Sequence, residues 1–251
     1  MNKLIGASWK MNMTPTEATA WFAVAVPELV SITDRELFVL PPFPALAAAR
    51  DALRATSIGW GAQDVHPDES GAHTGDVSAA MLADLGCHYV EIGHSERRRD
   101  HREGSELLAA KVAATRRWRM TPILCVGERR RGSIEEATPT IVRQLRGALG
   151  ALPPAELDEV VVAYEPVWAI GVGAAVAPAD HIAAAHRLIR RWLEGRLATR
   201  VSVIYGGSVD PSNAASILCL PGVDGLFVGR AALDPRAFVQ IAGTKCIEEE
   251  G

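Results

Sequence analysis

The sequence predicts an α/β protein folded as one closed (β/α)8 barrel, a single domain over residues 1–251. Eight short apolar runs recur along the chain, and helix-like segments separate them. Most of the runs are continuously apolar rather than alternating, which is typical of parallel strands buried on both faces. No long linker or break in composition divides the series, so the repeated units favour one closed barrel. A doubly wound open sheet is the alternative.

The chain alternates between expected strands and expected helices from its N-terminus onward. Short runs rich in apolar and β-branched residues predict strands, at 4–9, 37–40, 57–62, 89–93, 122–127, 160–164, 201–205 and 225–229. Apolar residues three and four positions apart predict helices, at 16–26, 45–54, 78–85, 105–117, 134–149, 178–193 and 234–242, with a shorter one near 212–218. Several helices open at cap-like residues, such as Thr14 ahead of Pro15.

Composition and charge exclude several classes of protein. The formal net charge is −4 with both signs interspersed, so neither a nucleic-acid surface nor an anionic-membrane surface is expected. No segment approaches the roughly 20 apolar residues of a membrane span, and the N-terminus lacks a signal-peptide pattern, so a cytoplasmic protein is expected. The 4 cysteines are widely spaced and the 7 histidines lack metal-ligand spacing, so neither a disulfide framework nor a metal site is expected.

Chemically useful side chains gather where the expected strands end, which is where barrels of this kind carry their active sites. Lys10 follows the first strand, His94 the fourth and Glu165 the sixth. A carboxylate shielded from water can remove a proton from carbon beside a carbonyl, while a neutral imidazole and an ammonium stabilise the enediolate oxygens. The imidazole stays neutral if the helix beginning near Ser95 points its positive end at His94.

Each of these three side chains also has an ordinary structural explanation. Lys10 could be a surface cation, His94 could cap the helix that SERRRD begins, and Glu165 could form a salt bridge with a neighbouring loop. The convergence of polar or glycine-rich segments from six strand ends on one face of the barrel favours catalysis instead.

Glycine-rich turns and a hinged segment complete the expected site. The turns YGGS and VGR offer backbone N–H groups to a phosphate. We interpret the segment from Pro166 to Val176 as a lid, because a proline fixes one hinge and Gly171 and Gly173 permit closure. A small anionic ligand that is covered after binding is therefore expected.

The motifs together resemble the triose-phosphate isomerase family over essentially the whole chain. The shared stretches are WKMN at 9–12, GAQDVHPDESGAHTGDVSAAML at 61–82, IGHSERR at 92–98, ILCVGE at 123–128, AYEPVWAIG at 163–171, YGGSV at 205–209 and VDGLFVG at 223–229. The resemblance implies the TIM-barrel form of the (β/α)8 fold, an isomerase of small phosphorylated sugars, and a role in glycolysis and gluconeogenesis. A glutamate base paired with a neutral histidine is an established pattern of this family, not a discovery from this sequence.

The resemblance also implies residue roles. Glu165 shuttles the proton, His94 acts as electrophile and proton donor, and Lys10 stabilises negative charge, with Ser95 and Glu96 supporting the site. The residues implied around the phosphate are Gly171, Ser208, Gly229 and Arg230. Neither a cofactor nor a metal is implied.

The connection 63–77 is polar and too long for a simple turn, and such a loop on a barrel can reach a partner subunit. In the family that this chain resembles, the corresponding loop inserts into the second subunit of a homodimer. The resemblance therefore implies a homodimer, with Thr74 near the partner's active site.

Three departures from the family pattern bear on the substrate. Ser8 stands where asparagine is usual, Arg230 where a second glycine is usual, and GVGAAV at 171–176 where the lid usually ends in a GTGKTA-type sequence. The first two look like a related branch that isomerises L-erythrulose 1-phosphate to D-erythrulose 4-phosphate. Ser8 is expected to leave room for the extra hydroxymethyl group, and Arg230 to hold phosphate through a charged hydrogen bond. This reaction and the interconversion of D-glyceraldehyde 3-phosphate with dihydroxyacetone phosphate both stay open.

Two further functions are kept as alternatives. A Schiff-base aldolase on a similar barrel would need a lysine near the end of the sixth strand, where this chain has Glu165. A non-catalytic phosphate-binding barrel would account for the altered lid and for Arg230.

Overall fold

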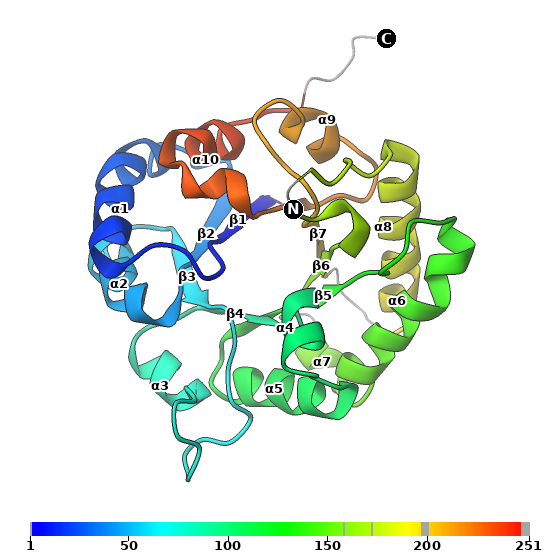
Figure 1. Ribbon diagram of the computed structural model, residues 1–251, viewed down its shortest axis with the longest axis horizontal. Helices are drawn as coiled ribbons and strands as arrows, with labels where there is room; N and C mark the ends of the chain where they lie inside the picture. Colours follow the sequence, from blue (N-terminus) through cyan, green and yellow to red (C-terminus); the bar gives the residue numbers. More distant parts are fainter. Residues whose placement is uncertain (1, 158, 172, 197–200, 247–251) are drawn as a thin grey trace.

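The computed structural model describes residues 2–157, 159–171, 173–196 and 201–246. Eight parallel strands form a closed barrel in the order β1 to β8, and the helices surround it (Figure 1). The strand β1 pairs in parallel with both β2 and β8, which closes the sheet on itself. The predicted (β/α)8 barrel is therefore confirmed, and the open doubly wound sheet is excluded.

The helices and strands lie close to the predicted ranges. The strands are β1 Lys3–Ser8, β2 Arg35–Leu40, β3 Gly59–Ala62, β4 Tyr89–Ile92, β5 Thr121–Val126, β6 Val161–Tyr164, β7 Ser202–Tyr205 and β8 Gly225–Val228. The α-helices are α1 Pro15–Leu29, α2 Leu46–Leu53, α3 Ala79–Asp84, α4 Ser95–Asp100, α5 Ser105–Arg117, α6 Ile134–Leu149, α7 Pro154–Leu157, α8 Ala179–Glu194, α9 Ala214–Leu218 and α10 Pro235–Ala242. Three 3-10 segments are η1 Phe43–Ala45, η2 Val167–Ala169 and η3 Arg230–Leu233. The short helix α7 and the 3-10 segments were not predicted, because three or four residues show no helical periodicity.

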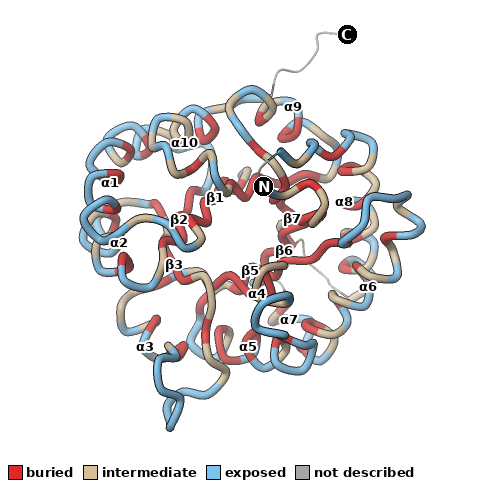
Figure 2. The backbone as a smooth tube through the Cα atoms, in the orientation of Figure 1, coloured by how far each residue is buried: buried red, intermediate tan, exposed pale blue. Residues whose placement is uncertain are grey.

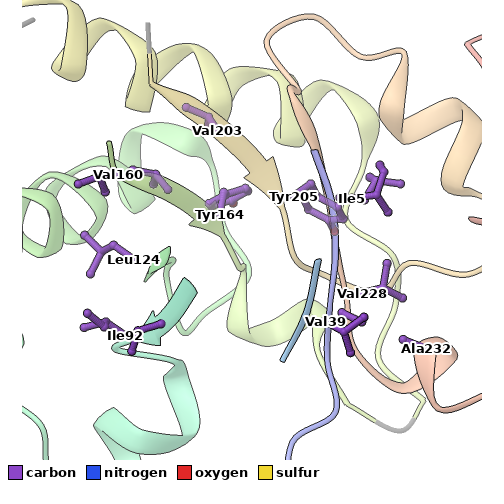
Figure 3. Packing of buried hydrophobic residues seen from close by; sticks show 14 of the residues in the cluster. Ile5, Val39, Ile92, Leu124, Val160, Tyr164, Val203, Tyr205, Val228 and Ala232 are labelled. Carbon is purple, nitrogen blue, oxygen red and sulfur yellow. The ribbon is translucent and has the colours of Figure 1, made fainter. Parts of the chain in front are cut away.

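Apolar side chains are buried on both faces of the strands, which explains the continuously apolar runs in the sequence. One layer fills the barrel interior and includes Leu4, Phe38, Ile123 and Phe227. The larger layer lies between the strands and the helices, whose inward faces are buried while their outer faces are exposed (Figure 2). Figure 3 shows part of this larger layer, with side chains carried by strands from around the barrel.

A buried ion cluster holds the base of the 63–77 connection against the helices. Asp64 forms an ion pair with Arg97 at 2.7 Å and accepts a hydrogen bond from Lys111 at 2.6 Å. The same two cations contact Glu103, at 2.8 and 2.7 Å. Beyond this anchor the connection extends away from the barrel between β3 and α3 (Figure 1), and Thr74 lies exposed within it. Among the described residues, no helix is both long and apolar enough to cross a membrane.

Candidate active site

A cavity of about 840 Å³ opens at the carboxyl ends of the strands. Nine of the predicted site residues line it, namely Ser8, Lys10, His94, Glu96, Glu165, Gly171, Ser208, Gly229 and Arg230. Two predicted residues do not. Ser95 lines a smaller cavity that also reaches Glu165, and Thr74 lies on the extended loop, outside the cavity of its own chain. Parallel strands running in one direction therefore bring together side chains that are far apart in the sequence.

Glu165 follows β6 directly, and its side chain is almost fully buried in the barrel mouth. Its Oε2 atom lies 3.4 Å from His94 Nε2. No described residue donates a hydrogen bond to that Oε2 atom, although it is buried. Burial raises the pKa of this carboxyl well above its ordinary value, and the nearby Glu91 carboxyl raises it further. A carboxylate in this position is a strong base that lacks a permanent partner.

His94 is the N-cap of α4, and its ring carries out two tasks. Its Nδ1 atom accepts a hydrogen bond from the backbone N–H of Glu96 at 3.2 Å, so Nδ1 carries no proton. The remaining proton therefore sits on Nε2, the atom that faces Glu165. Burial, followed by the charge of Lys10, lowers the pKa of His94 to about 4. The capping explanation and the catalytic explanation hold together, because burial keeps the imidazole neutral and the cap leaves its proton on Nε2.

Lys10 is held in an uncommon backbone conformation, with φ of 55°, directly after β1. Two amides fix this segment. Gln63 Nε2 donates to the Lys10 carbonyl at 3.0 Å, and Asn12 Nδ2 donates to the Trp9 carbonyl at 2.6 Å. The Lys10 ammonium donates to Glu96 Oε1 at 2.7 Å, which orients its charge at the cavity. The sequence analysis did not identify Gln63 as a support for this lysine.

A second carboxyl group, Glu91, lies inside the same cavity and was missed by the sequence analysis. Its side chain is 2% exposed, and its Oε2 atom accepts a hydrogen bond from Ser8 Oγ at 2.7 Å. Burial raises the pKa of Glu91 to about 7, although the Ser8 hydrogen bond opposes this shift. Ser8 and Glu91 both line the cavity, so the expectation that Ser8 leaves room for a longer sugar stays a prediction; the structure adds that the serine hydroxyl is hydrogen-bonded to Glu91. The sequence feature that could have indicated Glu91 as a site residue is its charge inside the otherwise apolar run YVEIG.

The lid segment is anchored at its first half by a buried carboxylate. Trp168 Nε1 donates to Glu128 Oε1 at 2.7 Å, and the Val167 N–H donates to the Glu128 carbonyl at 2.9 Å. Ser208 holds the same segment, since its hydroxyl and its N–H both donate to the Ala169 carbonyl, at 2.8 and 3.1 Å. Ser208 is therefore a lid contact in this structure, and its role in phosphate binding stays a prediction.

The second half of the lid contains two glycines in the left-handed region. Gly171 has φ of 116° and Gly173 has φ of 74°, so an added side chain would strain both positions. Val172 between them lies outside the described residues. These glycines are the positions at which the sequence predicted a hinge, and hinge motion itself stays a prediction.

Arg230 begins η3 and lines the cavity directly after Gly229. It forms no ion pair with any carboxylate that the structure describes. An exposed arginine at the cavity edge can offer its guanidinium to a phosphate through paired hydrogen bonds. The expected role of Arg230 in phosphate binding stays a prediction.

Two groups of described side chains could also hold a cation. Each group offers ligand atoms that lie within 4.8 Å of one another; the members are Glu91, His94 and Glu165 in the cavity, and His66, Asp68 and His73 on the extended loop. The sequence analysis predicted neither group. A cation in the cavity would occupy the atoms that a proton-transfer reaction needs free.

A buried carboxylate facing a neutral imidazole, beside an ammonium at the mouth of a closed parallel barrel, defines a barrel enzyme that moves protons to and from carbon. A family model described as triosephosphate isomerase matches residues 3–245. The chain belongs to the triosephosphate isomerase family and is an isomerase.

Several relatives resemble the chain along nearly its whole length. A triosephosphate isomerase of Thermus thermophilus is 46% identical over 246 residues, which cover 95% of this chain and 96% of the relative. An L-erythrulose-1-phosphate isomerase of Rhizobium meliloti is 41% identical, with coverage of 94% for each chain. Among solved structures, a triosephosphate isomerase from Bartonella henselae superposes with a TM-score of 0.82 at 32% identity, covering 96% of this chain and 98% of that one.

Proposed function

We propose that the protein isomerises a small phosphorylated sugar through an enediolate, interconverting D-glyceraldehyde 3-phosphate and dihydroxyacetone phosphate. The observation that carries the proposal is the 3.4 Å approach of Glu165 Oε2 to His94 Nε2 across the barrel mouth, with both side chains buried. The curated relatives that are named triosephosphate isomerases support this choice of substrate.

The proposed reaction transfers one proton between neighbouring carbons. Glu165 removes a proton from C1 of dihydroxyacetone phosphate, and the electrons of that C–H bond form the C1–C2 double bond. The C2 oxygen takes the negative charge, which the His94 Nε2–H and the Lys10 ammonium stabilise. His94 then moves a proton from the O1 hydroxyl to O2, and Glu165 returns its proton to C2. The product is the aldehyde, with no change in composition.

The remaining predicted residues have supporting roles in this proposal. Glu96 orients Lys10 through the 2.7 Å ion pair, and its backbone N–H bonds His94 Nδ1, which leaves the imidazole proton on Nε2. Ser95 lies at the smaller cavity on the other side of Glu165 and supports that base. The group that surrounds the phosphate comprises Gly171, Ser208, Gly229 and Arg230.

A second candidate reaction is the conversion of L-erythrulose 1-phosphate to D-erythrulose 4-phosphate. It uses the same base and the same electrophile, because the proton again leaves a carbon beside a carbonyl. Ser8 and Arg230, which line the cavity, depart from the usual family residues and favour this candidate. The relative from Rhizobium meliloti that carries this name supports it as well.

The same proposal makes the enzyme a cytoplasmic homodimer of single-domain subunits that acts in carbohydrate metabolism. Thr74 lies on a loop that extends from the barrel, and the large apolar side chains of Met11 and Met81 are 95% and 59% exposed. Exposed apolar groups of this size support a contact with a partner subunit. All four cysteines are free, as is usual in a reducing compartment.

Steady-state kinetics and solvent exchange test the proposal. Wild-type enzyme should interconvert one or both sugar pairs and should incorporate deuterium from D2O into its substrate. Glu165→Gln should lower kcat/KM about 10²–10⁴-fold, the usual contribution of a general base. Glu106→Gln, at an exposed carboxylate on α5, is the matched control and should leave both rates unchanged.

Two results would contradict the proposal. Undiminished deuterium incorporation by Glu165→Gln would show that another group takes the proton. Binding of phosphorylated ligands without turnover of either sugar pair would support a non-catalytic phosphate-binding barrel.

A further inference from the structure

We propose that Glu91 and Ser8 together form a hydroxyl-binding subsite at the inner end of the cavity, and that this subsite determines how long a ketose phosphate the enzyme prefers. The inference rests on the proposed function, because it takes Glu165 as the base. It assigns a role to Glu91 and makes the four-carbon sugar, the second candidate above, the preferred substrate of an enzyme that also turns over the three-carbon sugar.

The subsite is built from two strands that face each other across the cavity. Glu91 lies on β4, three residues before His94, so it sits deeper in the barrel than the imidazole. Ser8 is the last residue of β1, and its hydroxyl donates to Glu91 Oε2 at 2.7 Å. Ligand atoms of Glu91, His94 and Glu165 all lie within 4.8 Å of one another. A ligand that touches the base and the electrophile is therefore within reach of Glu91.

Glu91 has hydrogen-bonding capacity that the protein does not use. Its Oε1 atom has one long contact, from Cys125 Sγ at 3.8 Å, and the apolar Leu40 and Ile123 lie in the neighbouring interior layer. Burying a carboxyl group in such surroundings lowers the stability of the fold unless the group is well hydrogen-bonded. An aliphatic side chain of similar size would fill the space without this loss of stability. We therefore infer that a hydroxyl group of the bound ligand donates the missing hydrogen bond to Glu91.

The two candidate substrates differ at the place where Glu91 lies. In L-erythrulose 1-phosphate, a hydroxymethyl group replaces one hydrogen on the carbon that loses its proton. Glu165 must contact that carbon, so the hydroxyl of the extra group is only two bonds from the reacting centre. It can donate to Glu91 Oε1, while Ser8 holds Oε2. Dihydroxyacetone phosphate has no such hydroxyl and leaves Glu91 without its partner.

Competing kinetics on the two sugars test the subsite. Wild-type enzyme should have a higher kcat/KM for L-erythrulose 1-phosphate than for dihydroxyacetone phosphate. Glu91→Leu should lower the four-carbon value about 10- to 100-fold relative to the three-carbon value, because only the four-carbon sugar loses a hydrogen bond, whereas the smaller pKa shift of Glu165 affects both sugars. Glu91→Gln retains an acceptor oxygen and should keep most of the preference.

Further variants guard against a general disturbance of the barrel. Tyr89→Phe removes a hydroxyl from the same strand, where the ring stacks on Phe38 at 4.7 Å, and should leave the preference unchanged. Ser8→Ala removes the donor that orients Glu91 and should reduce the preference severalfold without changing a buried charge. It serves as the second test should Glu91→Leu fail to fold.

The outcomes separate this inference from the proposed function. Turnover of dihydroxyacetone phosphate with equal losses for both sugars in Glu91→Leu would overturn the subsite and leave the isomerase intact. A wild-type preference for the three-carbon sugar would likewise overturn the subsite without contradicting the isomerase activity. Activity lost in EDTA and restored by Zn²⁺ or Mg²⁺ would assign Glu91 to a metal site instead. Turnover of neither sugar would overturn both proposals.

Discussion

Glu91 should make the stability of the protein fall as the pH rises. Its carboxyl is buried, and its pKa is about 7 in place of the ordinary 4.5. Between these two values the folded chain holds a proton that the unfolded chain has released, so the free energy of unfolding decreases with increasing pH. A difference of that size corresponds to about 3 kcal/mol, with roughly 1.4 kcal/mol for each pH unit. The effect is complete above pH 7 and absent below pH 4.5.

Glu91→Gln removes this titration while keeping the shape of the side chain. Urea unfolding at pH 5 and pH 8, at one protein concentration, should show that the loss of stability between the two values is about 2.5 kcal/mol smaller in the variant, since part of the effect already lies below pH 5. Glu165 titrates in the same direction, and its pKa shift should also shrink because Glu91 contributes to it. Glu106→Gln, at an exposed position, should follow the wild-type curve. Equal losses in wild-type enzyme and Glu91→Gln would refute the reasoning.

Three other predictions concern the loop anchor, the lid and the metal. Lys111→Met removes one of the two cations that Asp64 and Glu103 share, while Arg97 stays, and should cost about 1.5–3 kcal/mol of unfolding free energy in urea titrations; a loss below about 1 kcal/mol would contradict it. Trp168→Phe removes the 2.7 Å bond to Glu128, so kcat/KM should fall about tenfold, and unchanged kinetics would show that this bond does not hold the catalytic lid. Dialysis against EDTA should leave kcat/KM unchanged, because Glu165 must remain a free base; activity that returns only with a divalent ion would argue otherwise.

The sequence by itself determined the barrel and most of the site. Strands buried on both faces read as continuous apolar runs, so their number and order could be predicted without any contact information. Parallel strands all end on one face of a closed barrel, so residues that follow strand ends meet there. Lys10, His94 and Glu165 could be grouped for this reason alone, and the structure brings all three to one cavity.

Only the tertiary structure decided which way the side chains within each strand point. The glutamate in YVEIG marks position 91 as unusual, but its apolar neighbours do not show which alternate residues face the barrel interior, so the inward direction of Glu91 could not be predicted. Its hydrogen bond with Ser8 joins two strands, and the support that Gln63 gives Lys10 joins the segments after β3 and β1; in both pairs the residues are more than fifty positions apart. Such contacts cannot be predicted from local sequence patterns, because the contacts depend on the register in which the strands pair around the barrel.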